Sequence, residues 1–216
     1  MSRTPLRRRL AALATSGVLA GGAVLAAGSP SQAADGAAEA LKTRSLATVL
    51  AADGARFDRD AQDFDVLERA VGLVLEARPG SRVGVLADGS RRTTAFLPTD
   101  QAFTRLVADL TGERPGSERA TFRAVRSLGV PTVNDVLLYH VLPGRTLTSE
   151  KVLAARGTRV GTALGAPIRV TVRNGDVLLG DRDFNDPNPQ VVVLDINRGN
   201  RQVGHAIDRV LRPADL

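Results

Sequence analysis

The segment Thr93-Thr94-Ala95-Phe96-Leu97-Pro98-Thr99-Asp100-Gln101-Ala102-Phe103 combines the signals of two kinds of secondary structure. Its first half favours a β-strand, which Pro98 ends because proline lacks a backbone N–H. Thr99 is a favourable N-cap residue, and an acidic residue directly after it suits the first turn of a helix. Four apolar residues then share one face of that helix: Phe103, Leu106, Val107 and Leu110. The stretch therefore predicts a strand followed at once by an amphipathic helix.

The segments on either side of this stretch predict further helices. Apolar residues recur at helical spacing in residues 45–50, 63–78, 117–128, 133–139 and 148–155. The expected N-cap residues are Ser45, Ser117, Thr132 and Thr148. A short apolar run over residues 83–86 predicts one additional strand.

After residue 157 the apolar pattern changes from helical spacing to alternation. Ile168, Val170 and Val172 alternate with polar residues, and Asn174-Gly175 follows. Asn-Gly accepts the positive φ angles of a type I′ turn, which predicts a hairpin. A polar loop over 181–190 leads to last strands at 191–194 and 203–211. Helices early and strands late predict an α+β fold.

Composition narrows the possible classes of protein. The chain has 216 residues, of which 43% are hydrophobic and 24% charged, as in globular domains. It has no cysteine, which excludes disulfides and thiolate chemistry, and only two histidines. The formal charge is +6, but the first 33 residues hold four arginines and no acid, which leaves 25 basic and 23 acidic residues elsewhere. This balance, without a basic stripe, argues against nucleic-acid binding.

The N-terminus has the three parts of a secretory signal peptide. Arg3 to Arg9 form a basic start, Leu10 to Gly28 are apolar or small, and Ser31-Gln32-Ala33 suits a cleavage site. We predict a signal peptide at 1–33, a flexible leader at 34–44 and a domain at 45–213. No later stretch reaches 18 apolar residues, so we expect a secreted, extracellular mature protein without a membrane span.

Three segments together resemble the fasciclin domain. They are residues 93–103, the run Val136-Leu137-Leu138-Tyr139-His140-Val141-Leu142-Pro143-Gly144, and the run Gly204 to Pro213. The resemblance covers residues 45–213 and implies N-terminal helices packed on a wedge of mixed or antiparallel sheet, with C-terminal strands. It implies structural roles for Phe96, Pro98, Thr99, Phe103, His205 and Asp208. It also makes Tyr139 and His140 candidate receptor contacts.

The loop Asp181 to Gln190 departs from the family pattern as an apparent insertion. Asp181, Asp183 and Asn185 place oxygen ligands at alternate positions, an arrangement that suits Ca²⁺. Asp186 stands where an EF-hand has glycine, and Val192 where it has glutamate. The loop therefore predicts either an irregular Ca²⁺ site or a solvated turn.

Catalytic chemistry finds little support in the sequence. There is no Gly-x-Ser-x-Gly motif, and a hydrolase triad would need His140 or His205. His140 lies in an apolar run, where a buried imidazole must be hydrogen-bonded, so we predict a structural role. Two histidines without cysteine also argue against zinc, and we expect no cofactor.

The resemblance implies a non-enzymatic adhesion or binding module of the bacterial surface or extracellular matrix. We expect a monomer with an extracellular protein or polysaccharide partner. Arg169 and Arg173 lie on one face of the predicted hairpin, so an anionic polysaccharide is also a possible partner. The alternative is an extracellular carrier whose groove between helices and sheet holds a small apolar ligand; a hydrolase is the third reading.

Overall fold

The computed structural model describes residues 41–54 and 56–215. The predicted signal peptide at 1–33 and residues 34–40 of the predicted leader lie outside the described residues. The helices are α1 (Leu46–Leu50), η1 (Ala51–Asp53), α2 (Asp65–Ala77), η2 (Arg82–Ala87), α3 (Asp100–Thr111), α4 (Glu118–Ser127), α5 (Val130–Tyr139) and α6 (Ser149–Ala154). The strands are β1 (Thr93–Pro98), β2 (Val141–Pro143), β3 (Arg159–Gly161), β4 (Pro167–Arg173), β5 (Asp176–Gly180), β6 (Val191–Ile196) and β7 (Gln202–Ile207).

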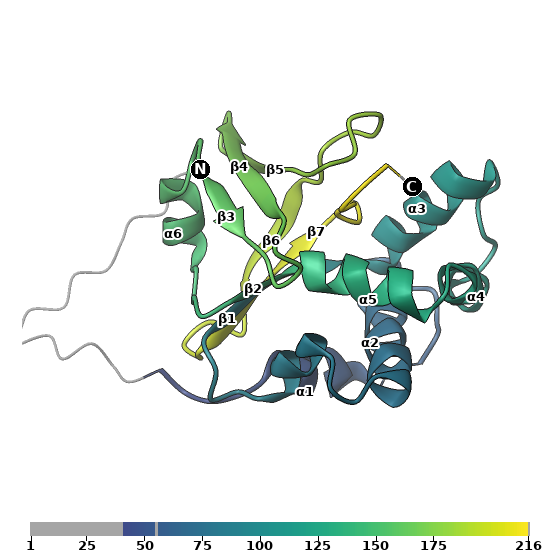
Figure 1. The fold of residues 1–216 in the computed structure, drawn as a ribbon, viewed down its shortest axis with the longest axis horizontal. Helices are drawn as coiled ribbons and strands as arrows, with labels where there is room; N and C mark the ends of the chain where they lie inside the picture. The colour runs from purple at the N-terminus through teal and green to yellow at the C-terminus, as the bar shows by residue number, and fades with distance from the viewer. Residues whose placement is uncertain (1–40, 55, 216) are drawn as a thin grey trace, which may run out of the picture. The chain divides into compact units, whose positions relative to one another are not determined.

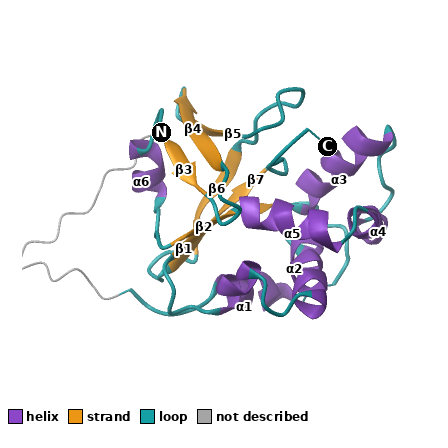
Figure 2. Ribbon diagram, viewed as in Figure 1, coloured by secondary structure: helices purple, strands orange, loops and turns teal. Residues whose placement is uncertain are grey.

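Two sheets hold the strands. The four-stranded sheet has the order β2-β1-β7-β6, with β1 antiparallel to β2 and parallel to β7. The three-stranded sheet β3-β4-β5 is antiparallel throughout. Helices and a mixed sheet in one unit confirm the predicted α+β fold (Figure 2).

Strand β1 separates two hydrophobic cores. Ala95 and Leu97 face a core that α1 to α5 share, whereas Phe96 between them faces a core shared with the β3-β4-β5 sheet. Alternate residues of a strand point to opposite faces, which is why one strand serves both cores. Figure 1 shows the result: α2, α4 and α5 lie together, and β3, β4 and β5 lie on the other side of β1 and β7.

Local sequence explains most of these elements. Thr99 accepts a hydrogen bond from Ala102 N–H and starts α3, and the Ser45 and Ser117 hydroxyls cap α1 and α4 in the same way. The hairpin of β4 and β5 turns at Asn174 and Gly175, both with positive φ. The capping and hairpin predictions at these positions are therefore confirmed.

Three local predictions were wrong. Residues 83–86 lie in the 3-10 helix η2, because the Ser81 hydroxyl accepts Val83 N–H and starts a helical turn. Helix α5 begins at Val130, after Gly129 and with proline in its first turn, and so two residues before Thr132. The last strand ends at Ile207. Thr148 is the N-cap residue of α6 as predicted, but its side chain makes no capping bond; Asp195 Oδ1 accepts the Ser149 N–H, at 2.7 Å.

The end of the predicted leader is held in the fold. Lys42 N–H donates to the Gly199 carbonyl, and Arg201 N–H donates to the Lys42 carbonyl, both at 2.9 Å. The Asn197 amide donates to the Arg44 carbonyl at 2.8 Å. Ordered chain therefore begins before residue 45. Among residues 41–54 and 56–215, no helix combines the length and apolarity that a membrane span requires.

Candidate binding surface

His140 joins the end of α5 to the segment after β7. Its Nε2 accepts the Leu211 N–H at 2.9 Å, which places the ring proton on Nδ1. Nδ1–H then donates to the Val136 carbonyl at 2.7 Å. Burial lowers the pKa of His140 to about 4, so the imidazole is neutral at physiological pH. One neutral ring thus satisfies one buried donor and one buried acceptor.

Tyr139 faces the sheet side of the same junction. Its side chain is fully buried, and its hydroxyl donates to the Pro167 carbonyl at 3.2 Å. Burial raises the pKa of Tyr139 to about 12. Because Tyr139 and His140 both lie below the surface, a direct receptor contact through either side chain stays a prediction that requires neighbouring segments to move.

His205 ties β7 to two other segments. Nε2–H donates to the Leu147 carbonyl at 2.8 Å, and Nδ1 accepts the Asp195 N–H at 3.3 Å. Burial lowers its pKa. Both histidines of the chain therefore bond the backbone through both ring nitrogens, and neither offers a free nitrogen to a serine.

The remaining motif residues also hold the fold together. Phe96 and Phe103 lie in the two cores, and Pro98 ends β1 directly before the Thr99 cap. Asp208 accepts the Gln190 N–H at 2.8 Å and pairs with Arg105 at 2.8 Å. The motif thus connects β1, α3 and the chain after β7.

The loop 181–190 is fastened to the C-terminal segment by Arg212. Asp181 accepts the Arg212 N–H at 2.8 Å, and Asp183 binds the Arg212 guanidinium at 2.9 Å. The other Asp181 and Asp183 oxygens accept the N–H groups of Asp183 and Asn185 in successive turns. Because Arg212 already supplies positive charge to these aspartates, the structure favours a turn over a Ca²⁺ site in this loop. Ca²⁺ binding by Asp181, Asp183 and Asn185 stays a prediction.

Strand β6 presents an apolar surface to solvent. It lies at one end of the four-stranded sheet, and its pairing with β7 is irregular on both sides of Val193. Val192, Val193 and Leu194 are 46%, 51% and 40% exposed. We call these three residues the β6 surface. Our sequence interpretation placed a strand here but missed its exposure, because an apolar run is typical of a buried strand.

Loop 181–190 carries a second exposed apolar side chain. Phe184 is 94% exposed and lies inside the turn in which Asp183, a partner of Arg212, accepts the Asn185 N–H. Surface loops that a rigid scaffold supports are common carriers of recognition.

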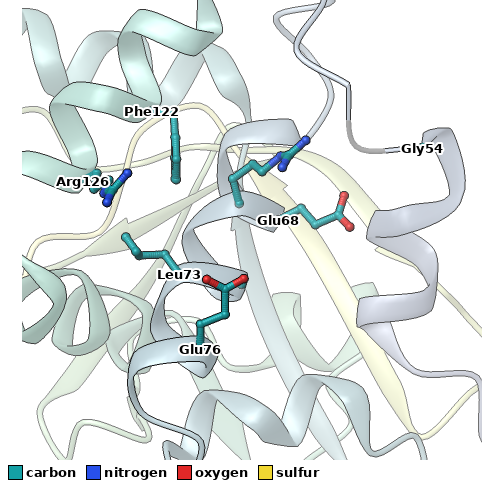
Figure 3. Close-up of a pocket in the computed structure, with 8 residues that line it drawn as sticks. Gly54, Glu68, Leu73, Glu76, Phe122 and Arg126 are labelled. Carbon is teal, nitrogen blue, oxygen red and sulfur yellow. The ribbon is translucent and has the colours of Figure 1, made fainter.

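A cavity of about 470 Å³ opens between α2 and α4 (Figure 3). Leu73 and Phe122 provide apolar surface, but Glu68, Glu76 and Arg126 also line it. The volume is that of a ligand pocket, whereas pockets for apolar molecules are lined mainly by apolar side chains. This cavity therefore gives little support to the carrier reading.

Comparison with known proteins identifies the family. The profile described as "Fasciclin domain" matches residues 72–213, more than half of the chain. The chain belongs to the fasciclin domain family. Members of this family are generally cell-adhesion modules without enzymatic activity. No match was found among curated proteins.

Solved structures that match include the FAS1 domain pair of the insect cell adhesion molecule Fasciclin I. The TM-score is 0.51 at 18% sequence identity, a likeness that shows the fasciclin fold alone. The match covers 71% of this chain and 48% of the insect chain, so this chain spans about half of that domain pair.

Proposed function

We propose that this protein is a secreted, non-enzymatic adhesion module that binds a protein partner through the β6 surface. The observation that carries the proposal is the exposure of Val192, Val193 and Leu194 in succession on an edge strand. Exposed edges are usually blunted by charged residues or proline, and this one has neither at these three positions. An apolar patch favours a protein over an anionic polysaccharide.

The area of the β6 surface determines how much it is expected to contribute to the free energy of binding. Full burial of one valine or leucine stabilises by about 1.5–3 kcal/mol, and these three are already about half buried. If a partner covered these three side chains, their burial would contribute about 2–4 kcal/mol to the free energy of binding, equivalent to about a 30- to 1000-fold change in Kd. Such a contribution is large enough for one substitution to be seen in a binding assay.

The test compares beads coated with wild-type protein and with Val193→Lys for adhesion to cells and matrix of the producing organism. Leu153→Lys is the matched control, because Leu153 is 40% exposed on α6, outside the β6 surface. We expect adhesion to fall at least tenfold for Val193→Lys and to persist for Leu153→Lys. Equal adhesion of all three proteins would contradict the proposed surface.

Export is part of the proposal and rests on the pattern of residues 1–33. N-terminal sequencing of protein recovered from the culture medium should give a start near Ala34. An intact Met1 on extracellular protein would contradict cleavage. Native mass spectrometry of the same material tests the carrier alternative, because a carrier would retain a small molecule.

A further inference from the structure

Three aspartates meet where α2 and α3 begin. Asp65 is the first residue of α2, Asp100 is the first residue of α3, and Asp63 lies just before α2. One carboxylate oxygen from each lies within 4.8 Å of those of the other two. The Asp100 N–H donates to the Asp63 carbonyl at 3.1 Å, and Gln101 N–H donates to the Ala61 carbonyl at 2.8 Å. Backbone bonds therefore hold the loop before α2 against the start of α3.

Asp100 provides the observation that points to a ligand. Its side chain is 0% exposed, and its Oδ1 accepts the Val66 N–H at 3.0 Å. Its Oδ2 is buried and accepts no hydrogen bond from outside the cluster within the described part of the chain, and the same holds for Asp63 Oδ1; the two carboxyl groups hydrogen-bond each other. Buried carboxylates are normally paired, hydrogen-bonded or bound to a metal ion. Neither Asp63 nor Asp100 forms an ion pair with any described residue.

The surroundings increase the negative charge at this point. Glu118, at the start of α4, is also buried, and its Oε2 accepts the Asp58 N–H at 2.6 Å. Burial and the neighbouring acids raise the pKa of Asp63 to about 7 and of Asp100 to about 8. The starts of α2, α3 and α4 thus bring four acidic side chains close together.

We propose that Asp63, Asp65 and Asp100 bind a divalent cation of the Ca²⁺ class. All three donors are hard carboxylate oxygens, which suit Ca²⁺ and Mg²⁺ and not thiophilic metals. Oxygens about 2.4 Å from Ca²⁺ lie at most about 4.8 Å apart when they are opposite ligands. The observed spacing is compatible with that limit, and water can complete the coordination shell.

A cavity lies beside the buried cluster. A cavity of about 420 Å³ is lined by Asp58, Asp100 and Glu118, and by Arg59 and Arg114. Asp100 thus borders both the cavity and the other two aspartates. A cation bound by the three aspartates would join the starts of α2 and α3, so its binding should be visible as added stability. This site is separate from the predicted one in loop 181–190.

The test measures thermal unfolding of the mature protein by far-UV circular dichroism at pH 7.5. The conditions are EDTA, CaCl₂ from 0.1 to 10 mM, and MgCl₂ over the same range. We expect the wild-type Tm to rise with Ca²⁺ by several degrees and to keep rising with the logarithm of its concentration. Calorimetric titration with CaCl₂ should show direct binding with proton release, because the carboxyl groups must ionise.

Asp100→Asn is the decisive variant. The asparagine keeps an oxygen for the Val66 N–H and turns an NH₂ group toward Asp63, so it should raise Tm in EDTA while abolishing the response to Ca²⁺. Asp176→Asn, at an exposed aspartate of the β4–β5 hairpin, is the matched control and should respond as wild type does. Asp63→Asn repeats the test at a less buried member if Asp100→Asn does not fold.

Three results would overturn the proposal. One is a wild-type Tm that 10 mM Ca²⁺ leaves unchanged, which would mean that the cluster holds only protons. Another is a full Ca²⁺ response in Asp100→Asn. The third is a response lost in the double variant Asp181→Asn, Asp183→Asn and retained in Asp100→Asn, which would place the ion in loop 181–190. The β6 adhesion assay is independent of all three.

Discussion

Replacing His140 with alanine should destabilise the protein through two separate buried groups. The imidazole donates to the Val136 carbonyl and accepts the Leu211 N–H, and both contacts are buried. Alanine leaves each group without that bond, and a buried polar group that loses its partner costs about 1–3 kcal/mol. The expected loss is therefore about 2–6 kcal/mol. For a domain of this size that corresponds to a fall in Tm of about 4–24 °C.

The assay is urea unfolding followed by far-UV circular dichroism and by tyrosine fluorescence. Tyr139 is the only tyrosine and the chain has no tryptophan, so its emission reports on this junction. The difference in the free energy of unfolding between wild type and His140→Ala should become smaller as pH falls from about 6.5 to about 4. The sign follows from the lowered pKa: the folded state keeps His140 neutral, the unfolded state takes up a proton, and the stability of wild type is lost over that interval.

His140→Gln is the control for the alanine variant. His140→Gln retains one amide donor and one oxygen acceptor and should recover part of the loss. If His140→Ala kept the wild-type Tm and urea midpoint but lost adhesion, His140 would be a contact residue, and the structural role argued above would be wrong.

Three further predictions follow from single sites. In EDTA, the stability advantage of Asp100→Asn over wild type should grow from pH 5 to pH 8, because the raised pKa of Asp100 keeps the folded wild type protonated over this interval while the unfolded chain is ionised, so the wild type loses stability as pH rises; a constant difference would contradict the raised pKa. Arg212→Met should cost about 3–5 kcal/mol in urea unfolding, since it leaves the buried Asp183 carboxylate without its 2.9 Å partner; a loss below about 1 kcal/mol would show that the pair adds little. Gly204→Ala should cost about 1–3 kcal/mol, because its Cβ would lie 2.5 Å from Leu97 Cδ1, whereas Gly161→Ala on β3 meets nothing within 4 Å and should be close to neutral.

Much of the fold could be predicted because its signals are local. The strand 93–98, its end at Pro98 and the Thr99 cap are encoded within a few residues of one another. The same is true of the turn at Asn174-Gly175, where positive φ angles require those residue types. The fasciclin resemblance rested on such local segments, and the family match agrees with it.

The candidate sites could be predicted less well because they depend on distant partners. Loop 181–190 was noticed from its composition, but nothing in its sequence indicated that Arg212 would bind two of its aspartates. The β6 surface was missed, since exposure of an edge strand depends on which strands lie beside it. The aspartate cluster was missed because Asp100 had already been explained as a first-turn acid.

Neighbouring residues indicated the caps of α1, α3 and α4, the turn at Asn174-Gly175, the apolar helix faces, and the need of a buried His140 for a hydrogen-bond partner. Capping, turn geometry and periodicity act over one or two turns, so neighbouring residues suffice to read them. The packing of the whole chain specifies that Leu211, 71 residues away, is that partner, and that Asp195, 46 residues beyond Ser149, caps α6. It also decided that Asp63 and Asp65 face Asp100. Such contacts depend on how the packed cores bring distant segments together, and no local preference specifies them.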